Sequence, residues 1–159
     1  MEGLTPYSLQ RELIDVLKEV VNGLYFEDNK GKKVPVNVYP QDLPPKINDD
    51  MVEPIPYVIV RLVSGKSPLD WRTINGEDMR VIILIGVRNS DKNGSAYSDL
   101  LNVMQKIKYR LQIKPVLIHF ALNSDIDWVI DDESPWPYAF GGLDMRWKGQ
   151  TIMREDILT

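Results

Sequence analysis

The sequence predicts one α+β domain spanning residues 1–159, in which two helices pack on a mostly antiparallel sheet of about five or six strands. Two stretches, residues 9–24 and 96–112, repeat apolar residues at the spacing of a helix with one buried face. The other apolar stretches are typical of strands, and the order is helix, strands, helix, strands. A chain of 159 residues can bury a core without disulfides, and this one has no cysteine.

The first helix is predicted from its cap and its apolar stripe. Thr5 and Pro6 are typical of an N-cap followed by the first helical position, and Asn22 and Gly23 supply a stop. The stripe consists of leucines and valines that should face a sheet: Leu9, Leu13, Val16, Leu17, Val20 and Leu24.

Strands are expected on both sides of a proline-rich segment. Three valines alternate with other residues over residues 34–38, and Pro35 among them favours a position at the edge of a sheet. The run YVIVRLV, residues 57–63, is a stronger strand signal because it is rich in β-branched residues.

Residues 40–56 hold five of the eleven prolines and interrupt these strands with a stiff, acidic segment. A domain linker is disfavoured because one helix and one or two strands before Pro40 cannot close a core. A lid is disfavoured because no catalytic site is evident beneath it. We therefore expect an arm that contacts another subunit, and we expect that deleting residues 43–53 leaves a folded subunit that no longer assembles. The expected interface takes residues from the arm, the hairpin that follows and one turn: Asp42, Leu43, Pro44, Pro45, Lys46, Ile47, Met51, Val52, Trp71, Arg72 and Trp136.

A hairpin extension is expected over residues 64–88. Asn75 and Gly76 both tolerate positive φ, so they predict a two-residue turn between two strands. The strand that follows contains VIILIGV, which is apolar at nearly every position. This composition predicts a central strand covered on both faces.

The second helix, residues 96–112, should end before Pro115 and carry its basic residues near its C-terminal end, where they suit the helix dipole. Its buried stripe is predicted from helical spacing: Tyr97, Leu100, Leu101, Met104, Ile107 and Leu111.

Two further strands are predicted near the C-terminus. Alternation over residues 126–132 should bury Trp128 and expose the aspartates. The last strand, residues 138–147, should be kinked at the pair Gly141 and Gly142.

Neither the phosphate-loop nor the triad pattern is complete. Gly65-Lys66-Ser67 resembles the end of a phosphate-binding loop, but Val60 stands where that motif needs glycine, and Pro68 replaces the start of a helix. The single histidine, His119, lies in an apolar run, and the chain contains no G-x-S-x-G elbow. A half-buried, hydrogen-bonded histidine is the favoured interpretation.

Asp125, Asp127 and Asp131 are the candidate metal ligands. Their even spacing places them on one face of a strand, as a hard-metal nuclease site would require. The same spacing describes the solvated face of a strand that buries its other side, and no Glu-x-Lys signature accompanies it. The solvated face is favoured over the metal site.

The aromatic residues could form a stacking platform for bases or sugars, or they could pack in the core. Core packing is favoured for Trp128 and Phe140. Trp136 stands between two prolines in a turn, so it is expected to be exposed, and an exposed tryptophan favours a protein interface.

Charge and hydropathy limit the partners. The formal net charge is −4, which disfavours wrapping of nucleic acid through phosphate contacts. The N-terminal residues lack the apolar core of a signal peptide, and no run approaches a membrane span. We therefore expect synthesis in the cytoplasm, no membrane partner and no secretion.

Three stretches of the chain resemble the tail-completion proteins of long-tailed bacteriophages, the tail terminator or tail-to-head joining group. The first is the short capped helix leading to VYP and PYVIVRL. The second is VIILIGV followed by the helix YSDLLNVMQKIKYRLQ, and the third is PYAFGGLDMRW.

The resemblance implies a structural subunit, without enzyme activity or cofactor, that forms a ring of six copies at the head-proximal end of the tail tube. Such a homohexamer stops polymerisation of the tail tube protein and presents a surface to the head connector or stopper protein. DNA passes through its lumen, and the finished subunit belongs to the neck of the virion.

Three other functions remain open at the sequence level. The chain could be another neck protein, a stopper or head-tail adaptor, or a small binding adaptor of a bacterial host. A metal-dependent nuclease or hydrolase that uses the three aspartates is the less favoured alternative.

Overall fold

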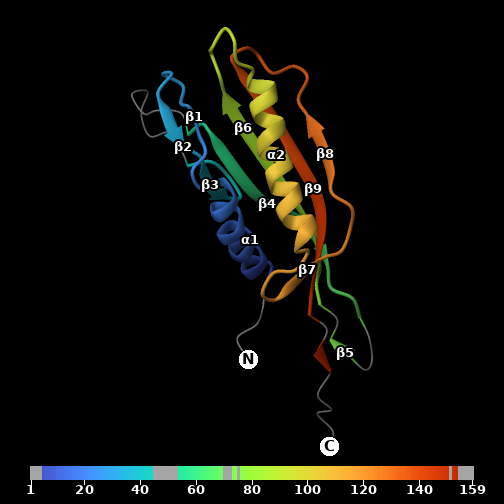
Figure 1. Cartoon of the computed structure of the whole chain (residues 1–159). Helices are drawn as coiled ribbons and strands as arrows, with labels where there is room; N and C mark the ends of the chain where they lie inside the picture. Colours follow the sequence, from blue (N-terminus) through green and yellow to red (C-terminus); the bar gives the residue numbers. More distant parts are fainter. Residues whose placement is uncertain (1–4, 45–53, 70–72, 75, 151, 154–159) are drawn as a thin grey trace, which may run out of the picture.

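In the computed structural model both helices lie on one face of a six-stranded sheet (Figure 1). The structure describes residues 5–44, 54–69, 73–74, 76–150 and 152–153. The predicted α+β domain with a mostly antiparallel sheet of about six strands is confirmed.

Both helices begin at the caps that the sequence provides. Helix α1, Pro6–Val21, is capped by Thr5, whose side chain accepts a hydrogen bond from the backbone N–H of Ser8. After the helix ends, Gly23 adopts a left-handed conformation with φ of +84°. Helix α2, Ala96–Ile113, is capped in the same way by Ser95.

The main sheet has the order β3-β4-β6-β9-β7, and β8 pairs with β9 on the same side as β7. β3 runs parallel to β4, and the other pairs are antiparallel. The strand bounds in this sheet are β3 Asn37–Pro40, β4 Tyr57–Lys66, β6 Asp78–Arg88, β7 Phe120–Leu122, β8 Asp127–Ile130 and β9 Tyr138–Gly149.

Two small two-stranded ladders flank the main sheet. β1, Tyr25–Glu27, and β2, Lys33–Pro35, form a hairpin beside β3 (Figure 1). β5, Thr73–Ile74, pairs with β10, Ile152–Met153, beyond the ends of the long strands.

The core fills the space between the helices and the sheet. Alternate residues of β4, β6 and β9 point toward the helices because side chains in a strand alternate between its two faces. Helix α1 packs against β3 and β4, and α2 packs against β6 and β9. The largest fully buried side chains come from both layers: Trp147, Leu9, Leu13, Leu17, Met79, Ile83, Ile85, Leu100, Met104, Ile107, Leu111 and Leu143.

The predicted pairing of residues 71–74 with residues 79–87 across Asn75 and Gly76 is wrong for the described strands, because β5 pairs with β10 and β6 pairs with β4; Asn75 itself lies outside the described residues. Gly76 serves a different need. A Cβ at this position would lie 2.0 Å from the backbone oxygen of Gly149, so glycine is required where two chain segments pass closely.

Two other local predictions are corrected. Tyr97 is exposed, and Trp128 is 56% exposed although it faces α2. β9 pairs with β6 in continuous register, so the kink expected at Gly141 and Gly142 involves no bulge and stays a prediction. Glycine is needed at position 141 because a Cβ would lie 2.8 Å from the carbonyl oxygen of Val129 on β8.

The prediction that the central strand is covered on both faces is also wrong for the described residues. β6 does lie between β4 and β9, but both helices pack on the same face (Figure 1). Its other face carries half-buried side chains that sequence composition alone could not distinguish from core. Among the described residues no helix is both long and apolar enough to cross a lipid bilayer.

Candidate functional site: the open face of the sheet and its pocket

The face of the sheet opposite the helices, called the open face below, is ordered in rows. Directly paired residues on neighbouring strands point to the same side of a sheet, so the strand register defines each row. The first two rows are Tyr57-Gly86-Phe140 and Ile59-Leu84-Gly142-Val129, and the third is Arg61-Ile82-Asp144-Asp127. The open face is therefore apolar toward the first row and charged toward the third.

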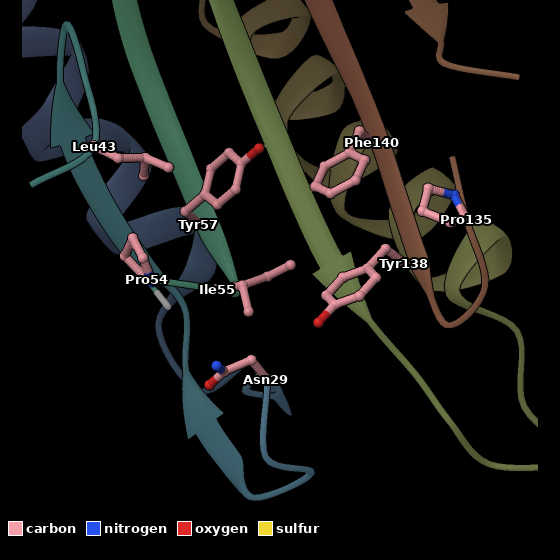
Figure 2. A pocket seen from close by; sticks show the side chains of 8 residues that line it. All are labelled: Asn29, Leu43, Pro54, Ile55, Tyr57, Pro135, Tyr138 and Phe140. Carbon is pink, nitrogen blue, oxygen red and sulfur yellow. The ribbon is translucent and has the colours of Figure 1, made fainter. Parts of the chain in front are cut away.

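A pocket of about 550 Å³ lies at the apolar end of the open face. Figure 2 shows Tyr57 of β4 and Phe140 of β9 on either side of β6, with Tyr138 beside Phe140. The Tyr57 and Phe140 ring centroids are 6.4 Å apart, and those of Tyr138 and Phe140 are 6.0 Å apart. The full lining comes from the β1–β2 turn, the two ends of the arm, β4, and β9 with the turn before it: Asn29, Leu43, Pro54, Ile55, Tyr57, Pro135, Tyr138 and Phe140.

Gly86 gives the Tyr57 ring its place in this pocket. A Cβ on Gly86 would lie 2.5 Å from the ring, so only glycine lets the ring lie flat across β6. Burial raises the pKa of the Tyr57 hydroxyl above its ordinary value, against the opposing effect of the Arg61 charge. Tyr57 is therefore an uncharged, partly buried aromatic surface at neutral pH.

The start of the proline arm is bound to the sheet through Gln41. Its φ of 64° turns the chain away from β3, and its backbone N–H donates to the Val60 carbonyl at 2.9 Å. Its side-chain amide pairs with both backbone groups of Leu62, at 3.0 and 3.1 Å. Gln10 on α1 donates to the Gln41 side-chain oxygen as well. The arm therefore starts from a fixed point.

The charged end of the open face is held by ion pairs. Arg80 donates to both carboxylate oxygens of Asp144, at 2.6 and 3.0 Å. This hydrogen bonding holds the pKa of Asp144 below its ordinary value, although partial burial acts in the opposite direction. Arg146 contacts Asp78 at 3.5 Å. Asp144 and Asp78 are thus paired with arginines, whereas Asp127, which lies opposite Asp144, forms no ion pair with a described residue.

A second ion pair anchors the β1–β2 hairpin beside the pocket. Arg88 donates to Glu27 at 2.7 Å, and both side chains are mostly buried. Glu27 also accepts hydrogen bonds from the backbone and hydroxyl of Ser90. The Arg88 guanidinium lies 5.8 Å from the Tyr138 ring centroid, which links this pair to the aromatic lining.

The expected interface residues divide into two groups. Asp42 is exposed and pairs with Arg61 at 3.0 Å, Leu43 lines the pocket, Pro44 is exposed, and Trp136 is 75% exposed. The others lie outside the described residues: Pro45, Lys46, Ile47, Met51, Val52, Trp71 and Arg72. The pocket lining brings Leu43 close to the open face but does not include Trp136.

His119 is half-buried and bound to a neighbouring carboxylate, as expected. Its backbone N–H and its Nδ1 contact the two Glu12 carboxylate oxygens at 2.9 and 3.1 Å. No serine hydroxyl bonds to His119 among the described residues. Gly65-Lys66 belongs to strand β4, and no helix follows it, so the phosphate-loop geometry is absent there.

The three candidate aspartates do not converge. Asp127 starts β8 and Asp131 follows its end, so their Cα atoms are about 13 Å apart in an extended chain. Asp125 and Asp127 line a separate 280 Å³ pocket with Arg80, Asp144 and Arg146, among others. In the part of the chain that the structure describes, no group of three acidic or histidine side chains is placed to hold a metal ion.

Sequence reasoning missed the aromatic pocket and the Gln41 anchor. Tyr57 was visible only as the first residue of a strand, and Phe140 was assigned to the core. A glycine inside an apolar strand, Gly86, was the available signal, because such a glycine often marks a close approach by another group.

No protein-family model matches the chain, and no curated protein is significantly similar to it.

Proposed function

We propose that this chain is a structural subunit of a bacteriophage neck, of the tail-terminator type, and that it forms a ring on the head-proximal end of the tail tube. In this role it stops tube polymerisation and joins the tail to the head connector. The observation that carries the proposal is the apolar end of the open face, where Tyr57, Leu84 and Phe140 remain partly exposed.

The physical argument starts from the cost of leaving such a face in water. Burial of a large apolar side chain contributes roughly 1.5–3 kcal/mol, so an apolar row on a sheet is a favourable contact surface for another protein. Tyr57, Leu84 and Phe140 are partly exposed in these two rows next to the pocket, whereas Ile59 in the second row is only 3% exposed. Aromatic side chains of this kind are frequent at the centres of protein interfaces.

The arm gives the second support. Gln41 fixes its start, and Leu43 at one end and Pro54 at the other both line the pocket. Proline lowers the conformational entropy that a segment loses on docking. An anchored, stiff segment next to an apolar face suits a subunit whose activity is association.

The described residues offer little for an enzyme by comparison. The only histidine is bound to Glu12, and two carboxylates of the open face, Asp144 and Asp78, are paired with arginines. A stopper or head-tail adaptor fits the same surfaces, so the partner that binds decides between these neck proteins.

Polymerisation of the tail tube protein in the presence of this chain tests the proposal. We expect the wild-type chain to shorten the tubes seen by electron microscopy and to sit at their ends. Leu84→Asp places a charge in the apolar rows and should abolish this effect. Ile113→Asp is the matched control, because Ile113 is exposed at the end of α2 and away from the open face.

Unchanged tube length together with no binding to tubes would rule out the terminator role. Binding to the head connector alone would identify the stopper or adaptor instead. Equal effects of Leu84→Asp and Ile113→Asp would show that the open face is not the contact surface.

A further inference from the structure

The two sides of the molecule end in unlike edges. β8 is the outer strand on one side, and the β1–β2 hairpin lies on the other, beside β3 (Figure 1). An unpaired strand edge presents backbone N–H and C=O groups that can pair with another chain, and proteins usually protect such edges. The chemistry of each edge therefore indicates what can bind there.

The β8 edge is open to pairing. Asp131 donates its backbone N–H to the Phe140 carbonyl of β9 at 2.9 Å. Backbone groups alternate in direction along an antiparallel strand, so those of Trp128 and Ile130 point away from β9. No proline interrupts β8. Trp128 is 56% exposed and Val129 is 65% exposed, which gives the edge an apolar centre.

The same edge is strongly acidic. Five exposed carboxylates lie on β8 or within three residues of its ends: Asp125, Asp127, Asp131, Asp132 and Glu133. None of them forms an ion pair with another described residue. Pairing of two β8 edges from two copies would bring both sets of carboxylates together, and like charges directly opposite destabilise a sheet. This edge therefore requires a basic partner.

The opposite edge supplies basic groups. Lys30, Lys32 and Lys33 are exposed on the β1–β2 hairpin, and no described carboxylate lies within ion-pair distance of them. The acidic residues of this hairpin are engaged internally. Glu27 pairs with Arg88, and Asp28 accepts hydrogen bonds from the backbone N–H groups of Lys30 and Lys32 at 2.9 and 3.0 Å.

We propose that copies of this chain associate head to tail, with the lysine hairpin (Lys30, Lys32 and Lys33) of one copy against the acidic β8 edge of the next. Trp128 and Val129 lie at the centre of this contact. Unlike surfaces on one molecule generate a ring or a filament, whereas identical surfaces would stop at a dimer. The inference deepens the proposed function and rests on it for the purpose of the ring, but self-association can be measured without a tube.

Charge exchange tests the pairing directly in the full chain. Asp131→Lys with Asp132→Lys reverses the acidic edge, and Lys32→Glu with Lys33→Glu reverses the hairpin. In sedimentation velocity and light scattering we expect each pair of changes to weaken self-association at least about tenfold, and the four changes together to restore it. Raising the salt concentration should weaken the wild-type association by a similar factor, because salt screens exposed charges.

Asp15→Lys with Glu19→Lys is the matched control for the acidic edge, since both residues are exposed on α1 and the net charge changes as in Asp131→Lys with Asp132→Lys. Circular dichroism and thermal melts verify that every variant is folded. A wild-type chain that stays monomeric up to about 1 mM, or stops at a dimer, overturns the inference. The inference is also overturned if either charge-reversed variant associates like the wild type, or if the variant with all four changes fails to restore association.

The two proposals fail separately. If charge exchange restores association but no variant acts on tail tubes, the edge contact stands and the terminator role is refuted. If the wild type and both reversed variants shorten tubes equally, the terminator role stands and the edge contact is refuted.

Discussion

Replacement of the arm separates its own packing from its role in assembly. β3 and β4 run parallel, so the connection must return the chain from Gln41 to Pro56, whose carbonyl bonds to Asn37. Pro40 is the partner of Val60, so Gln41 lies level with the next residue of β4, five residues beyond Pro56. The connection must therefore span about 17 Å.

A simple deletion of residues 43–53 leaves a connection that is too short to span this distance. It leaves Asp42, Pro54 and Ile55 between Gln41 and Pro56, and four extended steps reach only about 14 Å. A six-residue Gly-Ser bridge in place of residues 43–53 makes a flexible segment of nine residues, whose average end-to-end distance is about 15–18 Å. The bridged variant, and not the simple deletion, is therefore the variant that tests the arm.

The expected change in stability is small. Shortening the segment between Gln41 and Pro56 from fourteen residues to nine lowers the loop-closure cost by about 0.4 kcal/mol. Loss of the half-buried Leu43 costs about 1 kcal/mol. The net loss of about 0.6 kcal/mol corresponds to a Tm decrease of about 1–3 °C for a chain of this size.

Thermal melts and denaturant titration measure the stability of the bridged variant, and sedimentation measures its association. We expect a folded chain that associates more weakly than the wild type. If Ile47, Met51 and Val52 instead pack on their own core, their loss would cost roughly 5–9 kcal/mol and would unfold most of the protein. Such a loss, or undiminished association, would refute the arm interpretation.

Three further changes test other parts of the structure. Gly141→Ala should lower stability by about 1–3 kcal/mol in denaturant titration, because its Cβ meets the Val129 carbonyl at 2.8 Å; Gly142→Ala, with its nearest contact at 3.3 Å, is the milder control, and equal losses would contradict the reasoning. Glu27→Gln should cost about 3 kcal/mol by leaving Arg88 buried without its partner, and adding Arg88→Met should recover part of this loss; no recovery would show that the pair acts separately. The lowered pKa of Asp144 stabilises the fold above the ordinary carboxyl pKa of about 3.9, and this contribution is lost as the pH falls through the lower folded-state pKa. Asp144→Asn should therefore flatten the decrease in stability below about pH 4, and a decrease as steep as in the wild type would refute this role of Asp144.

Local signals were sufficient for the helices and for most strands. Thr5 determines the start of α1 through its hydrogen bonds with Ser8, and the positive φ of Gly23 follows its end, so both causes are local in the sequence. The long strands β4, β6 and β9 were identified from their β-branched and alternating residues. The fold class followed from the order of these elements.

Pairing between distant segments could not be predicted in the same way. β5 pairs with β10 across almost half of the chain, and no local pattern records such a contact. Gly76 and Gly141 were interpreted as a turn and a kink, but both allow close approach by a backbone that is remote in sequence. The same limit applies to Trp128, whose exposure depends on β8 being the outermost strand.

The candidate site was predictable only in part. Residues of the arm were recognised from proline and acidic content, and Leu43 does line the pocket. The rows of the open face required the register of three strands, which the sequence does not specify. The complementary edges were likewise invisible before the order β3-β4-β6-β9 placed the lysine hairpin and β8 on opposite sides.

The one-sided cover of β6 has a consequence for mutational scanning. Successive positions along this strand alternate between the helix layer and the open face, so a scan should give two interleaved profiles with a period of two residues. Substitutions facing the helices should reduce the yield of folded protein, at Met79, Val81, Ile83, Ile85 and Val87. Polar substitutions at the intervening Ile82 and Leu84 should leave that yield nearly unchanged and reduce fitness only where the partner is present. A library screened twice, once for abundance and once for the proposed effect on tail tubes, would therefore separate folding from the proposed function at neighbouring residues of the same strand.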